Sequence, residues 1–399
     1  MRPPTVPSYD VIVVGARAAG AATAHLLGRC GLRVLLVDRS RYGADTLSTH
    51  ALMRGGVLQL TRWGLIDEVI AAGTPPVYRT TFRYGDDVVP ITLKPSYGVD
   101  ALYAPRRTVL DPILVDAATA AGVETRFGVT VTDVRRDPGG AVKGISGRTA
   151  DGQAFQADAR IVVGADGLGS TIAERAGAVL ERVGSARSAL SYGYWSNLET
   201  DGYEWNYRTN AASGVIPTNG DQACVFVSAT PGRIGRGGLD VLLGVVAESS
   251  PDLAARLHDA TGPRSVRTFT GRPGHVRRSW GPGWALVGDA GYFKDPISAH
   301  GLTDALRDAE LLARAVITVV ADGVPEAVAL AGYQTQRDGL SAALFDVTDA
   351  IAGHRWTEAQ IPGLLLQLNA AMADEVEMLA ALTPLVPVAV PLTAGSVRQ

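Results

Sequence analysis

Cysteines, long apolar runs and blocks of like charge are scarce in this 399-residue chain, and each shortage excludes a class of protein. Two cysteines, Cys30 and Cys224, are too few for a disulfide framework and lie in no metal-ligand spacing. We expect both to be small buried residues, and we expect no metal site. The N-terminal apolar run stops at Gly15, too early for a signal peptide, and prolines interrupt the apolar C-terminal stretch. The sequence therefore predicts a cytoplasmic protein without a membrane span.

The charge balance argues against a nucleic-acid partner. The chain has 37 Lys and Arg against 40 Asp and Glu, a net charge of −3, and the basic residues are dispersed. A hydrophobic content of 46% with 46 glycines favours an ordered globular protein rich in loops. The length fits two to three domains, or one large domain with an insertion.

The first 40 residues have the order strand, glycine-rich turn, helix, strand. The apolar stretch 11–14 is typical of a parallel strand buried on both faces, and the helical stretch 18–31 supplies the crossover to a second strand that ends at Asp38. The turn reads Gly15-Ala16-Arg17-Ala18-Ala19-Gly20. This arrangement predicts a dinucleotide site, with a pyrophosphate at the helix N-terminus and the carboxylate on the ribose hydroxyls.

Arg17 occupies the position of the middle glycine in this fingerprint. Its Cβ should push the pyrophosphate back slightly, whereas its guanidinium could donate to a phosphate.

Two later strands also end in glycine and a carboxylate. Asp166-Gly167 follows the apolar stretch 160–164, and Gly288-Asp289 follows the stretch 284–287. Three such ends predict a ligand stretched along the carboxyl edge of one sheet.

The order of these patterns predicts an α/β fold made from interrupted segments. We expect a Rossmann-like nucleotide-binding domain with a parallel sheet, formed by residues 1–75, 99–187 and 271–324. A smaller strand-rich domain should comprise residues 76–98 and 188–270, and residues 325–399 should form a C-terminal helical segment.

With the three blocks in this order, the sequence resembles the FAD-dependent aromatic monooxygenases of the para-hydroxybenzoate hydroxylase fold, the class A flavoprotein monooxygenase superfamily. The resemblance covers most of the chain. It implies bound FAD, NAD(P)H as the reductant and O2 as the co-substrate. It also implies an aromatic or otherwise electron-rich substrate in the strand-rich domain, oxygenated through a flavin 4a-hydroperoxide.

The resemblance further implies roles for individual residues. Asp38 would bind the adenosine ribose, Arg107 the pyrophosphate or ribityl chain, and Asp289 a ribityl hydroxyl. Pro296 would border the isoalloxazine, and the helix from Gly301 would point its positive end at the flavin pyrimidine, which suits an anionic reduced flavin. The full set expected to bind FAD is Gly15, Arg17, Ala18, Ala19, Gly20, Asp38, Arg39, Arg107, Asp166, Gly288, Asp289, Pro296, Gly301 and Leu302.

No side chain stands out as an obligatory catalytic base, and Pro296, His300 and Lys294 are the candidates beside the flavin. His300 stands where many members of the family have Gln, and Lys294-Asp295 is an unusual charged pair. Either could touch the flavin or the substrate; the alternative is that His300 offers only backbone contacts and that the pair is a solvated part of a loop. His50 is expected to be a packing residue.

Six aromatic residues gather between positions 192 and 207. Alternation places them on the faces of two strands that we expect to lie side by side. One interpretation makes Tyr194, Trp205, Tyr207 and Pro217 the wall of a substrate pocket; the other is cross-strand packing.

Three other functions stay open at this point. A flavin-dependent halogenase and a geranylgeranyl-reductase-like flavoprotein share the fold, and a non-catalytic FAD-binding protein would keep the nucleotide site alone. The C-terminal helices could serve internal packing or a homodimer.

Overall fold

An eight-stranded sheet forms the centre of the structure, a computed structural model that describes residues 6–386. Its strands are β1 (Ser8–Val14), β2 (Val34–Asp38), β5 (Glu124–Phe127), β6 (Val129–Arg136), β7 (Val142–Thr149), β8 (Ala154–Gly164), β16 (Trp280–Gly281) and β17 (Trp284–Leu286). In the order β16-β17-β8-β1-β2-β5, every pair from β17 to β5 is parallel. β6 and β7 form an antiparallel extension beside β8.

The parallel sheet is buried on both faces, as its apolar strands predict. Val11 and Val13 of β1 belong to one apolar cluster, whereas Ile12 and Val14 belong to another on the opposite face. On the first face lie α1 (Ala18–Arg29), α4 (Arg107–Ala120) and α9 (Gly301–Val320). α2 (Arg54–Trp63) and α3 (Ile66–Ala71) follow on this side, and α5 (Thr171–Ala176) covers the other.

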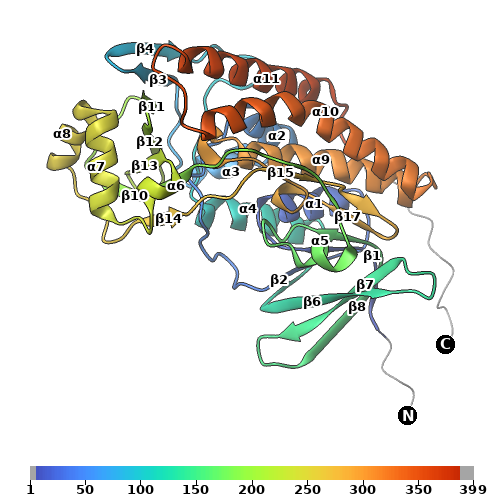
Figure 1. The fold of residues 1–399 in the computed structure, drawn as a ribbon. Helices are drawn as coiled ribbons and strands as arrows, with labels where there is room; N and C mark the ends of the chain where they lie inside the picture. The colour runs from blue at the N-terminus through green and yellow to red at the C-terminus, as the bar shows by residue number, and fades with distance from the viewer. Residues whose placement is uncertain (1–5, 387–399) are drawn as a thin grey trace.

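A second, seven-stranded sheet lies beside the first and holds the aromatic-rich segment. Its order is β14 (Arg267–Phe269), β10 (Ala189–Ser196), β13 (Gln222–Ala229), β12 (Ala211–Thr218), β11 (Tyr203–Arg208), β3 (Arg79–Tyr84) and β4 (Asp87–Thr92). The short helix α6 (Pro231–Ile234) follows β13, and α7 (Leu239–Ser249) and α8 (Pro251–Asp259) cover one end of the molecule (Figure 1). The strands come from residues 79–92 and 189–269, while the proposed domain boundaries stay a prediction.

The two aromatic-faced strands do not lie side by side, so that expectation was wrong. β12 and β13 separate β10 from β11, because β11, β12 and β13 form a meander of successive antiparallel strands. β10 then pairs with the last of them.

The C-terminal helices stack above the nucleotide-binding half. α10 (Glu326–Ala352) packs against α9, and α11 (Ile361–Ala381) packs against α10 and α2. Figure 1 shows them as an orange and red layer along the upper side. A small sheet of β18 (Tyr292–Phe293), β15 (His275–Arg277) and β9 (Leu180–Val183) lies below them. Part of the predicted helical segment, residues 387–399, lies outside the described residues.

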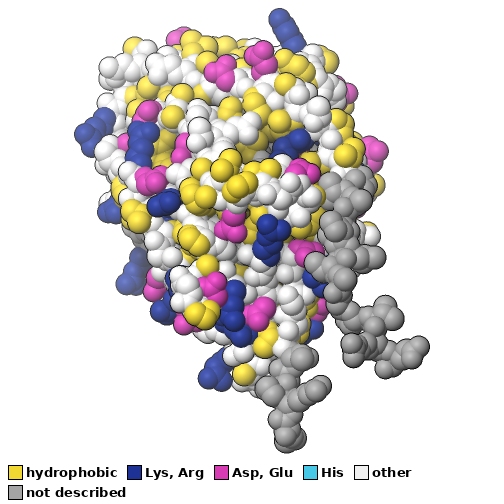
Figure 2. Space-filling model, turned by 90° about the vertical axis from the view of Figure 1, so that its right-hand side faces the viewer, with side chains coloured by type: hydrophobic (Ala, Val, Ile, Leu, Met, Phe, Trp, Pro, Cys, Tyr) yellow, Lys and Arg dark blue, Asp and Glu magenta, His cyan; other side chains and the backbone are white. Residues whose placement is uncertain are grey.

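The surface agrees with the balanced composition. On the face shown in Figure 2, basic and acidic side chains are interspersed with apolar and neutral ones. Within residues 6–386, none of the helices is both long and apolar enough to cross a bilayer.

Candidate cofactor and active site

One cavity of about 630 Å³ lies at the carboxyl ends of four parallel strands. Its wall includes the residues that directly follow β1, β2, β8 and β17: Gly15, Arg39, Ala165 and Val287. Of the residues expected to bind FAD, those that line the cavity are Gly15, Arg17, Ala18, Ala19, Asp38, Arg39, Arg107, Asp166, Asp289, Pro296, Gly301 and Leu302. The structure therefore brings three turns that are distant in the chain to one cavity.

The first turn leaves no room for a side chain at Gly15. Gly15 has φ +108°, and a Cβ there would lie 2.3 Å from the carbonyl oxygen of Ala165. Gly20 and Gly288 are not in the cavity wall, but they allow close packing: a Cβ on Gly20 would meet Gly15, and one on Gly288 would lie 2.8 Å from the Cβ of Ala19. The glycines thus bring the N-terminus of α1 against the sheet edge.

Arg17 points to a carboxylate of the protein. Its Nη1 lies 3.1 Å from an Asp111 carboxylate oxygen and also donates to the carbonyl oxygen of Ala44. Arg107 binds the same Asp111 through two hydrogen bonds of 2.9 and 3.1 Å. Asp111 therefore orients both guanidinium groups, and a phosphate contact from Arg17 would compete with these bonds.

The carboxylate of Asp38 is held by the two neighbouring turns. It accepts hydrogen bonds of 2.7 Å from the backbone N–H groups of Ala16 and Ser40. Each carboxylate oxygen can accept more than one donor, so Asp38 retains acceptor capacity towards the cavity.

Asp166 and Asp289 differ in their partners. Asp166 accepts from the Ser170 hydroxyl and from the N–H of Ile172, so it stabilises the start of α5 while lining the cavity. Asp289 lines the cavity and is exposed within it, and among the described residues no side chain donates to it. Burial raises the pKa of its carboxyl to about 6, which the positive charges of Lys294 and Arg107 partly oppose.

The N-terminus of α9 forms part of the cavity wall. Gly301, Leu302, Asp304 and Ala305 of its first turns line the wall, together with Pro296 from η2 (Pro296–Ser298). The first amides of a helix have no partner inside the helix, so this end carries partial positive charge towards the cavity.

Lys294 and Asp295 are both buried, so the alternative of a solvated loop pair was wrong. Lys294 lines the cavity and forms an ion pair with Asp304. Asp295 accepts bonds from the backbone and hydroxyl of Ser188 and from the N–H of Ile297, which fixes the loop. The two neighbouring side chains therefore do not act as a pair: Lys294 points to Asp304, and Asp295 points to Ser188.

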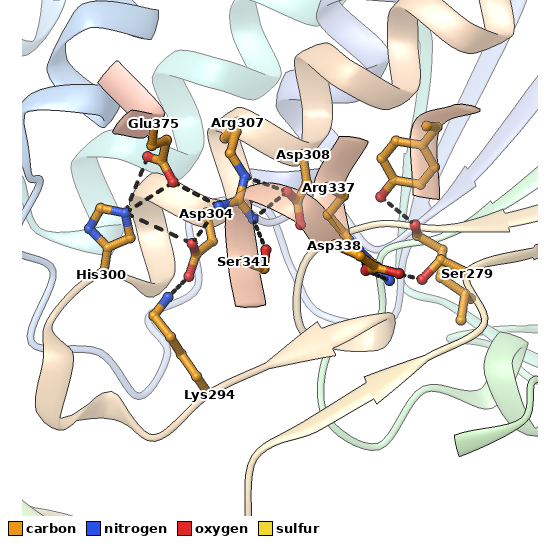
Figure 3. A network of polar contacts seen from close by, with 12 residues as sticks. Ser279, Lys294, His300, Asp304, Arg307, Asp308, Arg337, Asp338, Ser341 and Glu375 are labelled. Carbon is orange, nitrogen blue, oxygen red and sulfur yellow. Dashed lines mark hydrogen bonds and ion pairs between the residues drawn. The ribbon is translucent and has the colours of Figure 1, made fainter. Parts of the chain in front are cut away.

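His300 lies behind the wall, and its ring is bound to Glu375 of α11 at 3.2 Å. Arg307 joins this group through bonds of 2.7 Å to Glu375 and 2.8 Å to Asp308, as Figure 3 shows. Nothing in the local sequence around His300 pointed to Glu375, which lies 75 residues later.

His300, Asp304 and Glu375 offer ligand atoms within 4.8 Å of one another, a spacing that a metal ion could use. Both carboxylates already pair with cations, Asp304 with Lys294 and Glu375 with Arg307. The chemistry of the group therefore favours an ion-pair network.

The predicted aromatic wall has a different composition. The residues of the second sheet that line the cavity are Leu190, Tyr192 and Phe269, and Phe293 lies beside them. Tyr194, Trp205, Tyr207 and Pro217 are not among the lining residues, and their role in a substrate pocket stays a prediction.

These aromatic residues pack against other rings. Trp205 lies against Phe226, with ring centroids 5.5 Å apart, and Tyr207 lies against Trp356 at 5.8 Å. Tyr194 stacks on His50, whose ring also contacts the carbonyl oxygen of Ala104. His50 lines the cavity, and burial lowers its pKa to about 3, so the ring is neutral.

The cavity fits an elongated dinucleotide. Its wall contains the N-termini of two helices, α1 and α9, a carboxylate at the end of β2 for hydroxyl groups, and a glycine, Gly15, where a Cβ would obstruct the approach. The residues present thus match the group that the three blocks predict.

Comparisons with known proteins give relatives of more than one activity. Digeranylgeranylglycerophospholipid reductase of Methanocella arvoryzae is 24% identical over 358 residues, covering 84% of each chain. 6-Methylpretetramide 4-monooxygenase of Streptomyces rimosus is 28% identical over 346 residues, which are 80% of this chain and 57% of that protein. Among solved structures, flavin-dependent brominase Bmp2 has a TM-score of 0.79 at 20% identity and covers 94% of this chain and 93% of its own, which shows a shared fold.

The predicted resemblance to flavoprotein monooxygenases is confirmed at the level of the family. The model of the FAD binding domain family matches residues 8–348, most of the chain. The chain belongs to this family of FAD-dependent enzymes.

Proposed function

We propose that this protein is an FAD-dependent monooxygenase that oxygenates an aromatic or otherwise electron-rich small molecule, with NAD(P)H as the reductant and O2 as the oxidant. The observation that carries the proposal is that the three glycine and carboxylate blocks meet at one cavity. The side of this cavity that the second sheet and Phe293 form is aromatic and apolar. A relative named as a monooxygenase and another named as a hydroxylase support the proposal. The cytoplasmic location and the homodimer stay predictions.

When bound, FAD supplies the redox and oxygen-transfer chemistry, and the protein positions the reactants. The N-terminus of α1 and Arg107 would hold the phosphates, and Asp38 would accept from the ribose hydroxyls. The N-terminus of α9 would stabilise negative charge on the flavin ring. Asp289 would accept a hydrogen bond from the ribityl chain.

The wall of Leu190, Tyr192, Phe269 and Phe293 would exclude water from the reacting end. A flat apolar substrate matches these side chains. Tyr192 is itself fixed, because its hydroxyl accepts a hydrogen bond of 3.0 Å from the N–H of Ser48. This bond connects the loop after β2 to the second sheet, so both sides of the cavity are held together.

Oxygen consumption tests the proposal directly. The FAD-loaded protein is incubated with NADH or NADPH and a panel of phenols, indoles and polyketides under labelled dioxygen. We expect one labelled oxygen atom in a product and O2 uptake equal to the NAD(P)H oxidised. Product formation without oxygen would contradict a monooxygenase.

A reductase is the second candidate, because the relative from Methanocella arvoryzae matches over 84% of both chains. Such an enzyme would reduce an alkene, and anaerobic loss of a double bond from an isoprenoid substrate would favour it. A halogenase would instead need halide and give a halogenated product under the same aerobic conditions. A protein that binds FAD but turns over none of these substrates would favour a non-catalytic function.

A further inference from the structure

Lys294 is a buried lysine in a chain that uses arginine for almost all its positive charge. The chain contains three lysines, Lys94, Lys143 and Lys294. Lys94 is exposed and Lys143 half-buried, whereas the side chain of Lys294 is only 3% exposed. A lysine carries a compact charge that can be lost or gained, whereas an arginine is always charged. Lys294 therefore differs from the other cations in both place and chemistry.

The other cations of the cavity wall have different positions or partners. Arg17 and Arg107 are both bound to Asp111, and Arg39 is exposed beside Asp38. Lys294 is the one lysine or arginine among the described lining residues that belongs to the loop before α9. Its charge therefore acts beside Asp304 in the first turn of α9.

The carboxylate of Asp304 needs a compensating positive charge beside the start of α9. It lies in the first turn of α9 and lines the cavity, so its negative charge counteracts the positive helix end. Its Oδ2 pairs with Lys294, and its Oδ1 lies 3.2 Å from Nη1 of Arg307 (Figure 3). Arg307 is shared with Asp308 and Glu375, so Lys294 supplies the remaining compensation.

We propose that the ammonium group of Lys294 stabilises the anionic reduced flavin in this cavity and that Asp304 is the positioning residue that holds it. This inference rests on FAD binding as in the proposed function, but not on oxygen or on any substrate. A buried ion pair costs more free energy of desolvation than apolar residues of similar size. Stabilisation of the reduced flavin by the ammonium group would offset this cost and would give the ion pair a function.

The charge of Lys294 can respond to its surroundings. Burial and the positive charge of Arg307 lower the pKa of Lys294 to about 7, and nearby carboxylates oppose this. A negative charge added to the cavity would raise that pKa and favour the ammonium form. The ionisable and charged groups facing Lys294 are Asp289, Tyr292, His300, Asp304, Arg307, Asp308 and Glu375.

The redox step balances with an external reductant. Dithionite supplies two electrons, solvent supplies one proton to the flavin, and the ring gains one negative charge. A neutral Lys294 would take one further proton from solvent, and an ammonium would take none. Sulfite offers a probe without electron transfer, because its sulfur lone pair forms a bond to the oxidised flavin and leaves the ring with a negative charge.

The test is Lys294→Met in the FAD-loaded protein, with Lys143→Met as the matched control. Sulfite binding is followed by the loss of the flavin absorption band, and the midpoint potential is measured against a reference dye. We expect Lys294→Met to raise the Kd of sulfite at least tenfold and to destabilise the reduced state tenfold, about 30 mV for a two-electron couple. Lys143→Met should change neither quantity.

A second variant keeps the test decisive if Lys294→Met loses FAD. Lys294→Arg keeps a positive charge at this position, so it should leave the Kd of sulfite close to that of the unchanged protein. Loss of packing alone would weaken sulfite binding in both variants, whereas the proposed electrostatics predicts weaker binding only where the charge is removed. Sulfite affinity within twofold of the unchanged protein in Lys294→Met, with full FAD content, would overturn the proposal. Failure of the unchanged protein to bind FAD would instead overturn the proposed function.

Discussion

At the scale of single residues, Asp289 is exposed to solvent in the empty cavity, while protein surrounds its carboxyl on the other sides. Its pKa is raised from 3.8 to about 6, so the folded protein holds an extra proton between these two pH values. The cost of the charged carboxylate is therefore complete above pH 6 and disappears below pH 4. A position that weakens the empty fold in this way is typical of a binding site.

We therefore predict that Asp289→Asn raises the Tm of the FAD-free protein at pH 8 by at most about 1 °C, because water in the open cavity screens the charge, and raises it less at pH 5. The asparagine cannot ionise, so it avoids the cost that grows as the pH rises. Thermal unfolding followed by circular dichroism measures the effect. Asp374→Asn, at an exposed position on α11, is the control, and an equal change at both pH values would contradict the prediction.

The sequence was informative where chemistry depends on local spacing. Gly15 and Asp38 belong to one short pattern, and the structure places both in the cavity wall. The partners of Lys294 and His300 could not be predicted in the same way, because Glu375 comes from a helix far along the chain. The charged residues Asp304, Arg307 and Asp308 in the amphipathic pattern of this helix gave a signal, since buried charges need partners, but the pattern did not identify the partners.

At the scale of elements, Glu375 connects α11 to the start of α9. It is fully buried, and the positive charge of Arg307 and the hydrogen bond with His300 outweigh the cost of burial and lower its pKa. Removing the carboxylate would leave the buried guanidinium of Arg307 without one of its partners.

We predict that Glu375→Ala lowers the free energy of unfolding by about 3–5 kcal/mol, the range found for breaking a buried ion pair. Urea denaturation measures the change. Glu377→Ala, on the exposed side of the same helix, should stay within about 0.5 kcal/mol of the unchanged protein. A small effect of Glu375→Ala would mean that α11 is held by its apolar contacts alone.

Helices were more predictable than strand pairing. The predicted helical stretch 18–31 coincides with α1 within two residues, and the helix predicted from Gly301 begins where α9 begins. Pairing of β10 with β13, by contrast, depends on contacts between distant strands, and alternation within one strand cannot specify its neighbour.

At the scale of the whole molecule, one apolar core joins both large sheets. A single cluster contains Leu26 of α1, Tyr192 and Phe226 of the second sheet, and Leu368 of α11. The cavity also has walls from both sheets. The α/β architecture was predicted, but this continuity was not, because the sequence shows segments and not the contacts between them.

We predict a single thermal transition in which near-ultraviolet and far-ultraviolet circular dichroism give the same Tm. FAD at about 100 times its Kd should stabilise the protein by about 2.7 kcal/mol and move both signals together. Two separate transitions, with FAD shifting only the first, would show that the strand-rich part unfolds by itself.

The parallel pairing of β3 with β11 also determines when the second sheet can form during synthesis. Thr80 lies opposite Tyr203, so more than a hundred residues must be synthesised before β3 obtains this neighbour. At about 5–20 residues per second, translation leaves the β3–β4 hairpin without its sheet for several seconds. Three apolar residues of β4 are exposed even in the folded protein: Val88, Val89 and Ile91. The nascent chain therefore carries an exposed, aggregation-prone hairpin during this interval. Codon choice and chaperone supply between these two segments should therefore influence the yield of active enzyme in a recombinant host.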